Sequence, residues 1–197
     1  MNKKSKIILL IPITILIIFL VLRLFFKDTL FNIDNSISSY IFSIRNNTLT
    51  SIMKFITIFG STKFIIVVTI FDILFERNLY FASGIVINAL VNYILKNTIK
   101  RSRPSNILVH ENTYSFPSGH SSSSMFFYGY LIYNVSKSNL SKSLKILFIF
   151  LLIMFILLVG FSRLYLGAHY FSDVMCGYSI SFIILIIFIY IRNKLTK

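Results

Sequence analysis

The stretch IILLIPITILIIFLVLRLFF, residues 7–26, is 20 residues long and contains a single charged residue, Arg23. A helix needs about 20 consecutive, mostly apolar residues to cross the hydrocarbon core of a bilayer. A cleavable signal peptide has a shorter apolar region, of about 7–15 residues, followed by a small-residue cleavage site. No such site follows Phe26. We therefore expect an uncleaved first membrane-spanning helix here.

The composition of the whole chain agrees with a membrane protein. Of its 197 residues, 56% are hydrophobic and 13% charged, whereas a typical soluble domain carries about 25% charged residues. The 21 Phe and 11 Tyr exclude a disordered chain, which is poor in aromatics. Further apolar runs predict spans over 60–76, 79–97, 119–136, 144–161 and 172–191. We expect one all-α, polytopic domain over residues 1–197, with six transmembrane helices in one bundle.

Residues 35–59 follow a different pattern. Apolar residues recur there at steps of three and four, separated by Ser, Asn and Thr, and the pattern is interrupted at Asn46-Asn47. This spacing predicts an amphipathic helix. Such a helix can lie in the membrane interface or pack against the bundle, and the pattern favours both equally. We expect the interfacial position.

The net charge of +14 comes from 20 Lys and Arg against 6 Asp and Glu. The cations lie between apolar runs, which argues against nucleic acid and for anionic lipid headgroups or an anionic substrate. In the six-span arrangement each side of the membrane carries ten Lys and Arg, and the count becomes ten to seven once Lys96, Arg103 and Arg163 are set aside for a site. The positive-inside rule then predicts cytoplasmic termini and a site that faces outward.

Three polar clusters fall on one face of this arrangement. The first runs from Lys96 to Arg103-Pro104, the second is Pro117-Ser118-Gly119-His120, and the third contains Ser162-Arg163, His169 and Asp173. Each cluster alone has a structural explanation: a solvated loop, a capped helix start and a structural hydrogen bond. Together they place cationic side chains, histidines and a carboxylate at the ends of four predicted helices on one side of the membrane.

Phosphate binding is the chemistry that the cations indicate. Lys96, Arg103 and Arg163 suit a group with several anionic oxygens. Ser118 and Gly119 stand where a helix would begin, and backbone N–H groups at a helix N-terminus bind anions.

The reactive groups come from the same clusters. His169 and Asp173 are four residues apart and share a face on a helix, so the carboxylate can orient the imidazole as a nucleophile. His120 can protonate a leaving oxygen. Gly167 offers the break that would turn Arg163 and His169 toward the same point.

Lys96-x6-Arg103-Pro104, Pro117-Ser118-Gly119-His120 and Ser162-Arg163-x5-His169-x3-Asp173 together resemble the three-part signature of the type 2 phosphatidic acid phosphatase superfamily. The signature covers residues 96–173 and is complete. The resemblance implies that His169 forms a phosphohistidine, Asp173 activates it and His120 protonates the leaving group. It also implies phosphate binding by Lys96, Arg103, Ser118, Gly119 and Arg163. No metal is needed in this family, and the sequence shows no carboxylate cluster for Mg²⁺ and no His/Cys cluster for zinc.

Small members of this family are typically bacterial, so the resemblance implies a multi-pass protein of the bacterial cytoplasmic membrane. It implies metal-independent hydrolysis of a phosphorylated membrane lipid: undecaprenyl diphosphate, phosphatidylglycerol phosphate or phosphatidic acid. We expect no cofactor, no nucleic acid and no obligate protein partner. Transfer of the phosphate to another lipid would use the same site, and a non-catalytic lipid-binding or transport protein is the third alternative.

Overall fold

The computed structural model describes residues 3–76 and 79–195, which form eight helices and no strand. The helices are α1 (Lys3–Phe25), α2 (Lys27–Ser43), α3 (Asn47–Ile58), α4 (Thr62–Glu76), α5 (Leu79–Ile99), α6 (Gly119–Lys137), α7 (Lys142–Tyr165) and α8 (Phe171–Leu195). The all-α class that the sequence predicts is therefore confirmed. The helix starts at Leu79 and Gly119 are also as predicted, because an apolar run and a serine cap mark them.

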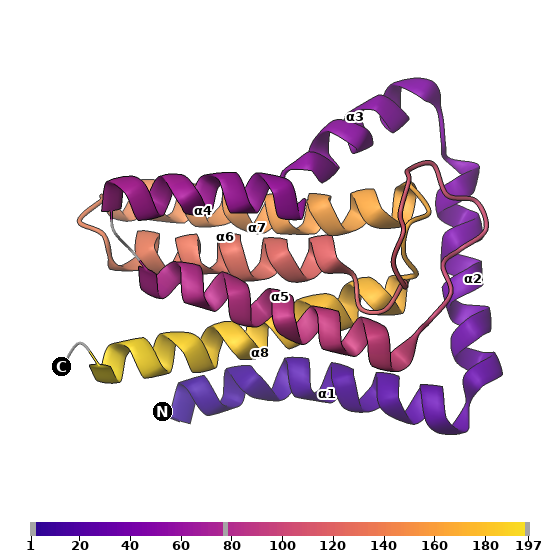
Figure 1. The fold of residues 1–197 in the computed structure, drawn as a ribbon, viewed down its shortest axis with the longest axis horizontal. Coiled ribbons are helices and arrows are strands. Elements are labelled where there is room, and N and C mark those ends of the chain that lie inside the picture. The colour runs from indigo at the N-terminus through magenta and orange to yellow at the C-terminus, as the bar shows by residue number, and fades with distance from the viewer. Residues whose placement is uncertain (1–2, 77–78, 196–197) are drawn as a thin grey trace.

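Helix α6 is the central helix of the bundle and packs against α4, α5, α7 and α8 (Figure 1). Its aromatic side chains Phe126 and Tyr130 are fully buried and join Leu185 and Phe188 of α8 in the main core cluster. The first turns of α6 instead bury serines. The helix thus changes from a polar end at the site to an apolar end inside the bundle.

The number of membrane spans differs from the expected six, which is not confirmed. Within residues 3–76 and 79–195, four segments are long and apolar enough to cross a bilayer: Asn47–Phe75, Leu79–Ile99, Lys142–Tyr165 and Phe171–Leu195. A fifth is added if the bent pair of α1 and α2 counts as one span. Helix α6, predicted as a span, is absent from this set, because its serines and other polar residues lower its hydropathy.

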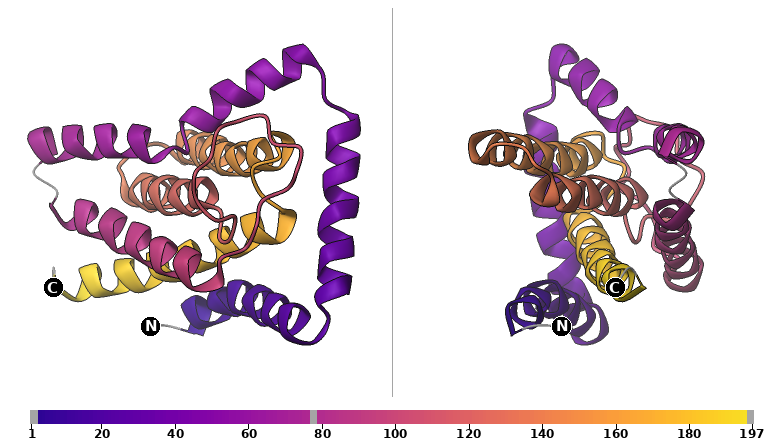
Figure 2. Two further views of the ribbon diagram at one scale, coloured as in Figure 1. Left: turned by 45° about the vertical axis from the view of Figure 1, so that its right-hand side comes forward. Right: turned by 90° about the vertical axis from the view of Figure 1, so that its left-hand side faces the viewer.

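The predicted amphipathic segment forms two helices, and its break lies at Ile44–Asn46 as expected. Asn46 caps α3 by accepting a hydrogen bond from the Leu49 amide. Helix α2 turns by 117° from α1 and crosses the end of the bundle (Figures 1 and 2). It buries one face against the bundle, through Leu30, Asp34, Ser38 and Ile41. Helix α3 joins α4 in a candidate span rather than lying apart from the bundle.

The loop between α5 and α6 and the turn between α7 and α8 meet at the end of the bundle that α2 crosses. The described chain ends at Lys3 and Leu195 lie together at the opposite end (Figure 1). Arg45 ties these parts together, since its guanidinium donates to the carbonyls of Tyr165 at 2.8 Å and Asn106 at 3.0 Å. These loops therefore gather at one end of the bundle, away from the described chain ends.

Candidate active site

His169 is positioned by a tight turn after α7. The helix ends at Tyr165, and Gly167 adopts a positive φ of 69°. A Cβ on Gly167 would approach the Asn106 carbonyl oxygen to 2.3 Å, so both the backbone conformation and the available space require glycine. The turn brings the His169 amide back to the Arg163 carbonyl at 3.3 Å. The structure thus contains the break that the sequence predicts at Gly167.

The two ring nitrogens of His169 face different groups. Nδ1 lies 3.8 Å from Oδ2 of Asp173, and Nε2 lies 3.3 Å from Nη1 of Arg103. The pair is not on one continuous helix, because α8 begins at Phe171 and His169 precedes it. Ser115 stands beside both residues: its hydroxyl donates to Asp173 and is 3.5 Å from Nδ1. Nε2 is therefore the nitrogen that is directed toward the cations.

Asp173 is fully buried and held by several donors. Oδ2 accepts from the Tyr170 amide at 3.0 Å, and Oδ1 accepts from Arg101 at 2.7 Å. The same Arg101 guanidinium reaches Asp34 of α2 at 2.6 Å. Asp34 also accepts from the amide and hydroxyl of Ser172, at the start of α8. Arg101 thus connects Asp34 of α2 to Asp173, and it does not line the cavity described below.

The three cations predicted to bind phosphate converge near His169. Arg103 donates to the Ala168 carbonyl at 2.6 Å, and Lys96 donates to the Tyr114 carbonyl. Arg163 is 1% exposed and donates to Thr57 at 2.8 Å, while its Nε has no hydrogen-bond partner in the described part of the chain. Arg163 is thus almost fully buried and keeps one donor unused in the described structure.

Glu111 lies between two of these cations. Its carboxylate accepts from Arg103 at 3.2 Å and from Arg163. Burial raises the pKa of Glu111, but Arg163 and Arg103 outweigh burial and the pKa is lower than usual. The ionised carboxylate therefore occupies the position between the guanidinium groups where a phosphate would bind.

The N-terminus of α6 supplies the second predicted cluster. Ser118 is the N-cap, and its hydroxyl accepts from the Ser121 amide at 3.4 Å and the Ser121 hydroxyl at 2.9 Å. The Ser118 amide donates to the Asp173 carbonyl at 3.1 Å. Gly119 and His120, in the first turn, line the cavity. The first amides of a helix have no intrahelical acceptor, so this end can bind an anion.

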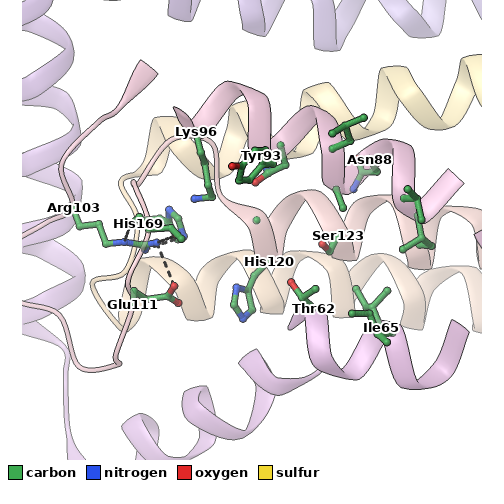
Figure 3. A pocket seen from close by; sticks show the side chains of 18 residues that line it. Thr62, Ile65, Asn88, Tyr93, Lys96, Arg103, Glu111, His120, Ser123 and His169 are labelled. Atoms are coloured by element: carbon green, nitrogen blue, oxygen red, sulfur yellow. Dashed lines mark hydrogen bonds and ion pairs between the residues drawn. The ribbon is translucent and has the colours of Figure 1, made fainter. Parts of the chain in front are cut away.

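A cavity of about 620 Å³ collects these groups. Figure 3 shows Lys96, Arg103, Glu111, His120 and His169 around its polar end. Gly119 lines it as well, whereas Arg163, Ser118 and Asp173 do not and lie behind the residues that do. The other end runs between α4 and α5 and is mostly apolar. The cavity thus has the form of a headgroup site that continues into an apolar groove.

The chemical state of His169 fits a nucleophile. The side chain is 2% exposed, and this burial lowers its pKa to about 4, with Asp173 raising it and Arg163 and Arg103 lowering it further. The imidazole is therefore neutral at neutral pH, and the lone pair of Nε2 accepts from Arg103 at 3.3 Å in the absence of a ligand. No group of three or more His, Cys, Asp or Glu side chains within residues 3–76 and 79–195 is arranged to hold a metal ion.

Four residues of this site were not predicted from the sequence: Asp34, Arg101, Glu111 and Ser115. Arg101 was identified only as part of a basic run, and Glu111 lies in a polar loop with no periodic pattern. For Asp34 and Glu111 the one available signal was their charge, since the chain holds only six Asp and Glu. In so apolar a chain each carboxylate is costly to bury and needs a partner.

The described end of the bundle combines a buried histidine–aspartate pair with three cations and an apolar groove, an arrangement that suits a phosphorylated lipid. The comparisons agree with this interpretation. The sequence model of the PAP2 superfamily matches residues 77–197. Phosphatidylglycerophosphatase B of Bacillus subtilis (strain 168) is 32% identical over 88% of this chain and 90% of its own length. Human dolichyldiphosphatase 1 is 32% identical over 59% of this chain and 55% of its own.

Solved structures show the same fold. A PAP2-type phosphatidylglycerolphosphate phosphatase from Bacillus subtilis superposes with a TM-score of 0.81 at 28% identity, over 93% of this chain and 96% of that one. Aquifex aeolicus LpxE superposes with a TM-score of 0.67 at 22% identity, over 80% of this chain and 95% of that one. At this identity the likeness shows the fold alone. The chain belongs to the PAP2 superfamily, as its resemblance implied. It is a bacterial membrane protein of the lipid phosphatase class.

Proposed function

We propose that the protein hydrolyses a phosphate ester or anhydride of a membrane lipid through a phosphohistidine on Nε2 of His169, without a metal ion. The observation that supports this most is the neutral, buried imidazole whose Nε2 lies 3.3 Å from Arg103 at the polar end of the cavity. A phosphate that binds Arg103 there would place its phosphorus next to the lone pair.

The first half-reaction forms the Nε2–P bond and breaks the bond between phosphorus and the lipid oxygen. Arg103, Arg163, Lys96 and the amides at the start of α6 stabilise the charge on the transferring phosphoryl group. Burial and the nearby cations, Arg163 first, lower the pKa of His120 in the empty site, and the negative charge of a bound phosphate favours its protonated form. The protonated ring then donates its proton to the departing lipid oxygen. Asp173, held by Ser115 and Arg101, stabilises the positive charge that develops on the ring of His169.

The second half-reaction restores the enzyme. His120, now neutral, takes a proton from water as the water oxygen attacks phosphorus, and the Nε2–P bond breaks. Phosphate then leaves and Glu111 can return to the arginines. If an alcohol of a second lipid replaced the water, the same steps would give phosphotransfer.

The substrate that we propose is a lipid with a terminal phosphate, with phosphatidylglycerol phosphate first. A relative that is aligned over 88% of the chain is named for that activity, and the apolar groove beside Lys96 suits a lipid chain. Undecaprenyl diphosphate and phosphatidic acid are the competing substrates.

The test is phosphate release by the purified protein in detergent with EDTA, with the three lipids in parallel. We expect release from one of them. His169→Ala should lose at least 10⁴-fold in kcat, since loss of a nucleophile in a studied hydrolase costs about 10⁶. Rapid quenching with ³²P-labelled lipid should trap an acid-labile label on His169. Normal turnover by His169→Ala would refute the mechanism, and a labelled acceptor lipid in place of free phosphate would show transfer.

We infer cytoplasmic termini and an outward site from the charge count, and the described chain ends lie at the end of the bundle opposite the site (Figure 1). Asn112 is exposed in the loop over the site. In a variant with Cys176 replaced, Asn112→Cys should react with an impermeant thiol reagent in intact cells. Reaction only after permeabilisation would reverse the orientation.

A further inference from the structure

One face of α5 carries a row of polar side chains through the apolar groove. Asn88, Asn92 and Lys96 are four residues apart, and all three line the cavity. Each step of four residues advances about 6 Å along a helix. Asn92 is therefore one turn further into the bundle than Lys96, on the side where the apolar part of a bound lipid would lie.

The two asparagines differ in their partners. Oδ1 of Asn88 accepts hydrogen bonds from Ser181 at 2.6 Å and Ser122 at 3.4 Å. Asn92 is 8% exposed, and its Nδ2 has no hydrogen-bond partner in the described part of the chain. A buried amide donor without an acceptor destabilises the fold, and such exceptions call for a specific explanation. The fold therefore supplies hydrogen-bond partners for the Asn88 side chain, but it supplies none for Nδ2 of Asn92 within the described residues.

The position of Asn92 connects it to the phosphate site. Its Oδ1 lies 3.6 Å from where a Cβ of Gly119 would stand, so it borders the start of α6. The amide is thus beside the point where the scissile phosphate would meet the helix N-terminus. An acceptor atom next to that phosphate, on the membrane side, would satisfy Nδ2.

The charge of the groove restricts what that acceptor can be. The cations that line the cavity are Lys96 and Arg103, and both are at the polar end. The groove beyond Lys96 is lined by uncharged residues: Thr62, Ile65, Ile66, Ile85, Val86, Asn88, Ala89, Leu90, Asn92, Tyr93 and Ser123. An anionic phosphate bonded directly to the scissile one would lie beside Asn92 and be buried there without a counter-charge. A neutral oxygen would need only one donor.

We propose that Nδ2 of Asn92 donates a hydrogen bond to the neutral C2 oxygen of the glycerol that carries the scissile phosphate, so that Asn92 selects glycerol phosphate esters. The inference rests on the proposed function and specifies its substrate class. The C2 oxygen belongs to an ester in phosphatidic acid and to a hydroxyl in phosphatidylglycerol phosphate. Undecaprenyl diphosphate has an anionic phosphate in its place.

The test compares substrates with and without this oxygen. Asn92→Leu, which has a similar shape, and Asn92→Ala remove the donor. The substrates are dioctanoyl phosphatidic acid, phosphatidylglycerol phosphate, undecaprenyl diphosphate and dodecyl phosphate, which has no C2 oxygen. Asn97→Leu is the matched control, because Asn97 is on the same helix but exposed and bonded to the Tyr93 carbonyl.

We expect both Asn92 variants to lose about tenfold in kcat/KM on at least one glycerol lipid and less than twofold on dodecyl phosphate. The lipid on which the variants are less active shows which oxygen accepts the hydrogen bond: the ester oxygen of phosphatidic acid or the hydroxyl of phosphatidylglycerol phosphate. Equal losses on dodecyl phosphate would show a structural role and overturn the inference, as would a loss confined to undecaprenyl diphosphate or no loss. A wild-type protein inactive on all four substrates would overturn the proposed function itself, and the inference with it.

Discussion

Glu111→Gln should make the enzyme bind phosphate more tightly. In the structure the Glu111 carboxylate accepts hydrogen bonds from both Arg103 and Arg163. A phosphate that binds these arginines must first displace it. Glutamine keeps the size of the side chain but removes the charge, so it competes less with the ligand.

The magnitude follows from the two bonds. A hydrogen bond to a charged group contributes about 1.5–3 kcal/mol and a neutral one about 0.5–1.5 kcal/mol. The change therefore weakens each contact by about 1 kcal/mol, or about 2 kcal/mol for both. Since 1.4 kcal/mol is tenfold, the affinity for phosphate should rise about 30-fold. The side chains are 19% exposed for Glu111, 11% for Arg103 and 2% for Arg163, so solvent screens the contacts little.

The assay is product inhibition: the Ki of inorganic phosphate for wild type, Glu111→Gln and Asp28→Asn. Asp28 is an exposed carboxylate of α2, and its variant removes the same charge away from the site. We expect a lower Ki for Glu111→Gln alone. The pKa of Glu111 is below its usual value, so the wild-type Ki should not fall through protonation of Glu111 between pH 5 and 8. An unchanged or higher Ki for Glu111→Gln would show that the carboxylate positions the arginines instead of competing with phosphate.

Three shorter predictions test other parts of the molecule. Because protonation removes the lone pair of His169, whose pKa is about 4, kcat/KM should fall tenfold per unit as the pH drops below about 4. An acidic fall that begins near pH 6.5 would contradict the lowered pKa. Arg101→Ala leaves the buried Asp173 without its 2.7 Å cation and should cost about 3–5 kcal/mol of unfolding free energy, measured by thermal unfolding in detergent. Gly160→Ala places a Cβ 1.8 Å from the Tyr178 hydroxyl and should cost about 1–3 kcal/mol in the same assay, and an unchanged midpoint would show that the contact relaxes freely.

Several residues that the sequence singled out lie together in one cavity, whereas the expected number of spans is not confirmed. Lys96, Gly119, His120 and His169 each stand at or near a helix end or a break, and local chemistry marks such positions. Helix α7 shows the limit of hydropathy: the expected span ended at Phe161, yet the helix continues to Tyr165. Its last turn contains the buried polar residues Ser162 and Arg163. Hydropathy alone places such residues outside a span, because it does not distinguish buried polar side chains from exposed ones.

The contacts that complete the site depend on tertiary structure. The run from Lys100 to Arg103 holds two arginines two residues apart, and they serve different purposes. Arg103 lines the cavity, whereas Arg101 joins Asp34 to Asp173. Nothing local distinguishes them, because the difference arises from α2, which lies 67 residues away in sequence from Arg101 at its point of contact. The role of Glu111 was missed for the same reason.

The small residues of α6 and α8 explain why the polar clusters meet at all. A Cβ on Gly177 would lie 2.8 Å from the Ser118 carbonyl oxygen and 3.4 Å from the Cβ of Ser121. The two helices therefore approach closely where α6 begins, and this allows the Ser118 amide to reach the Asp173 carbonyl. A larger residue at Gly177 would push the N-terminus of α6 away from α8 and therefore from His169. The serines that lower the hydropathy of α6 thus permit the packing that brings the second and third clusters together, so the feature that removes α6 from the apolar spans also builds the site.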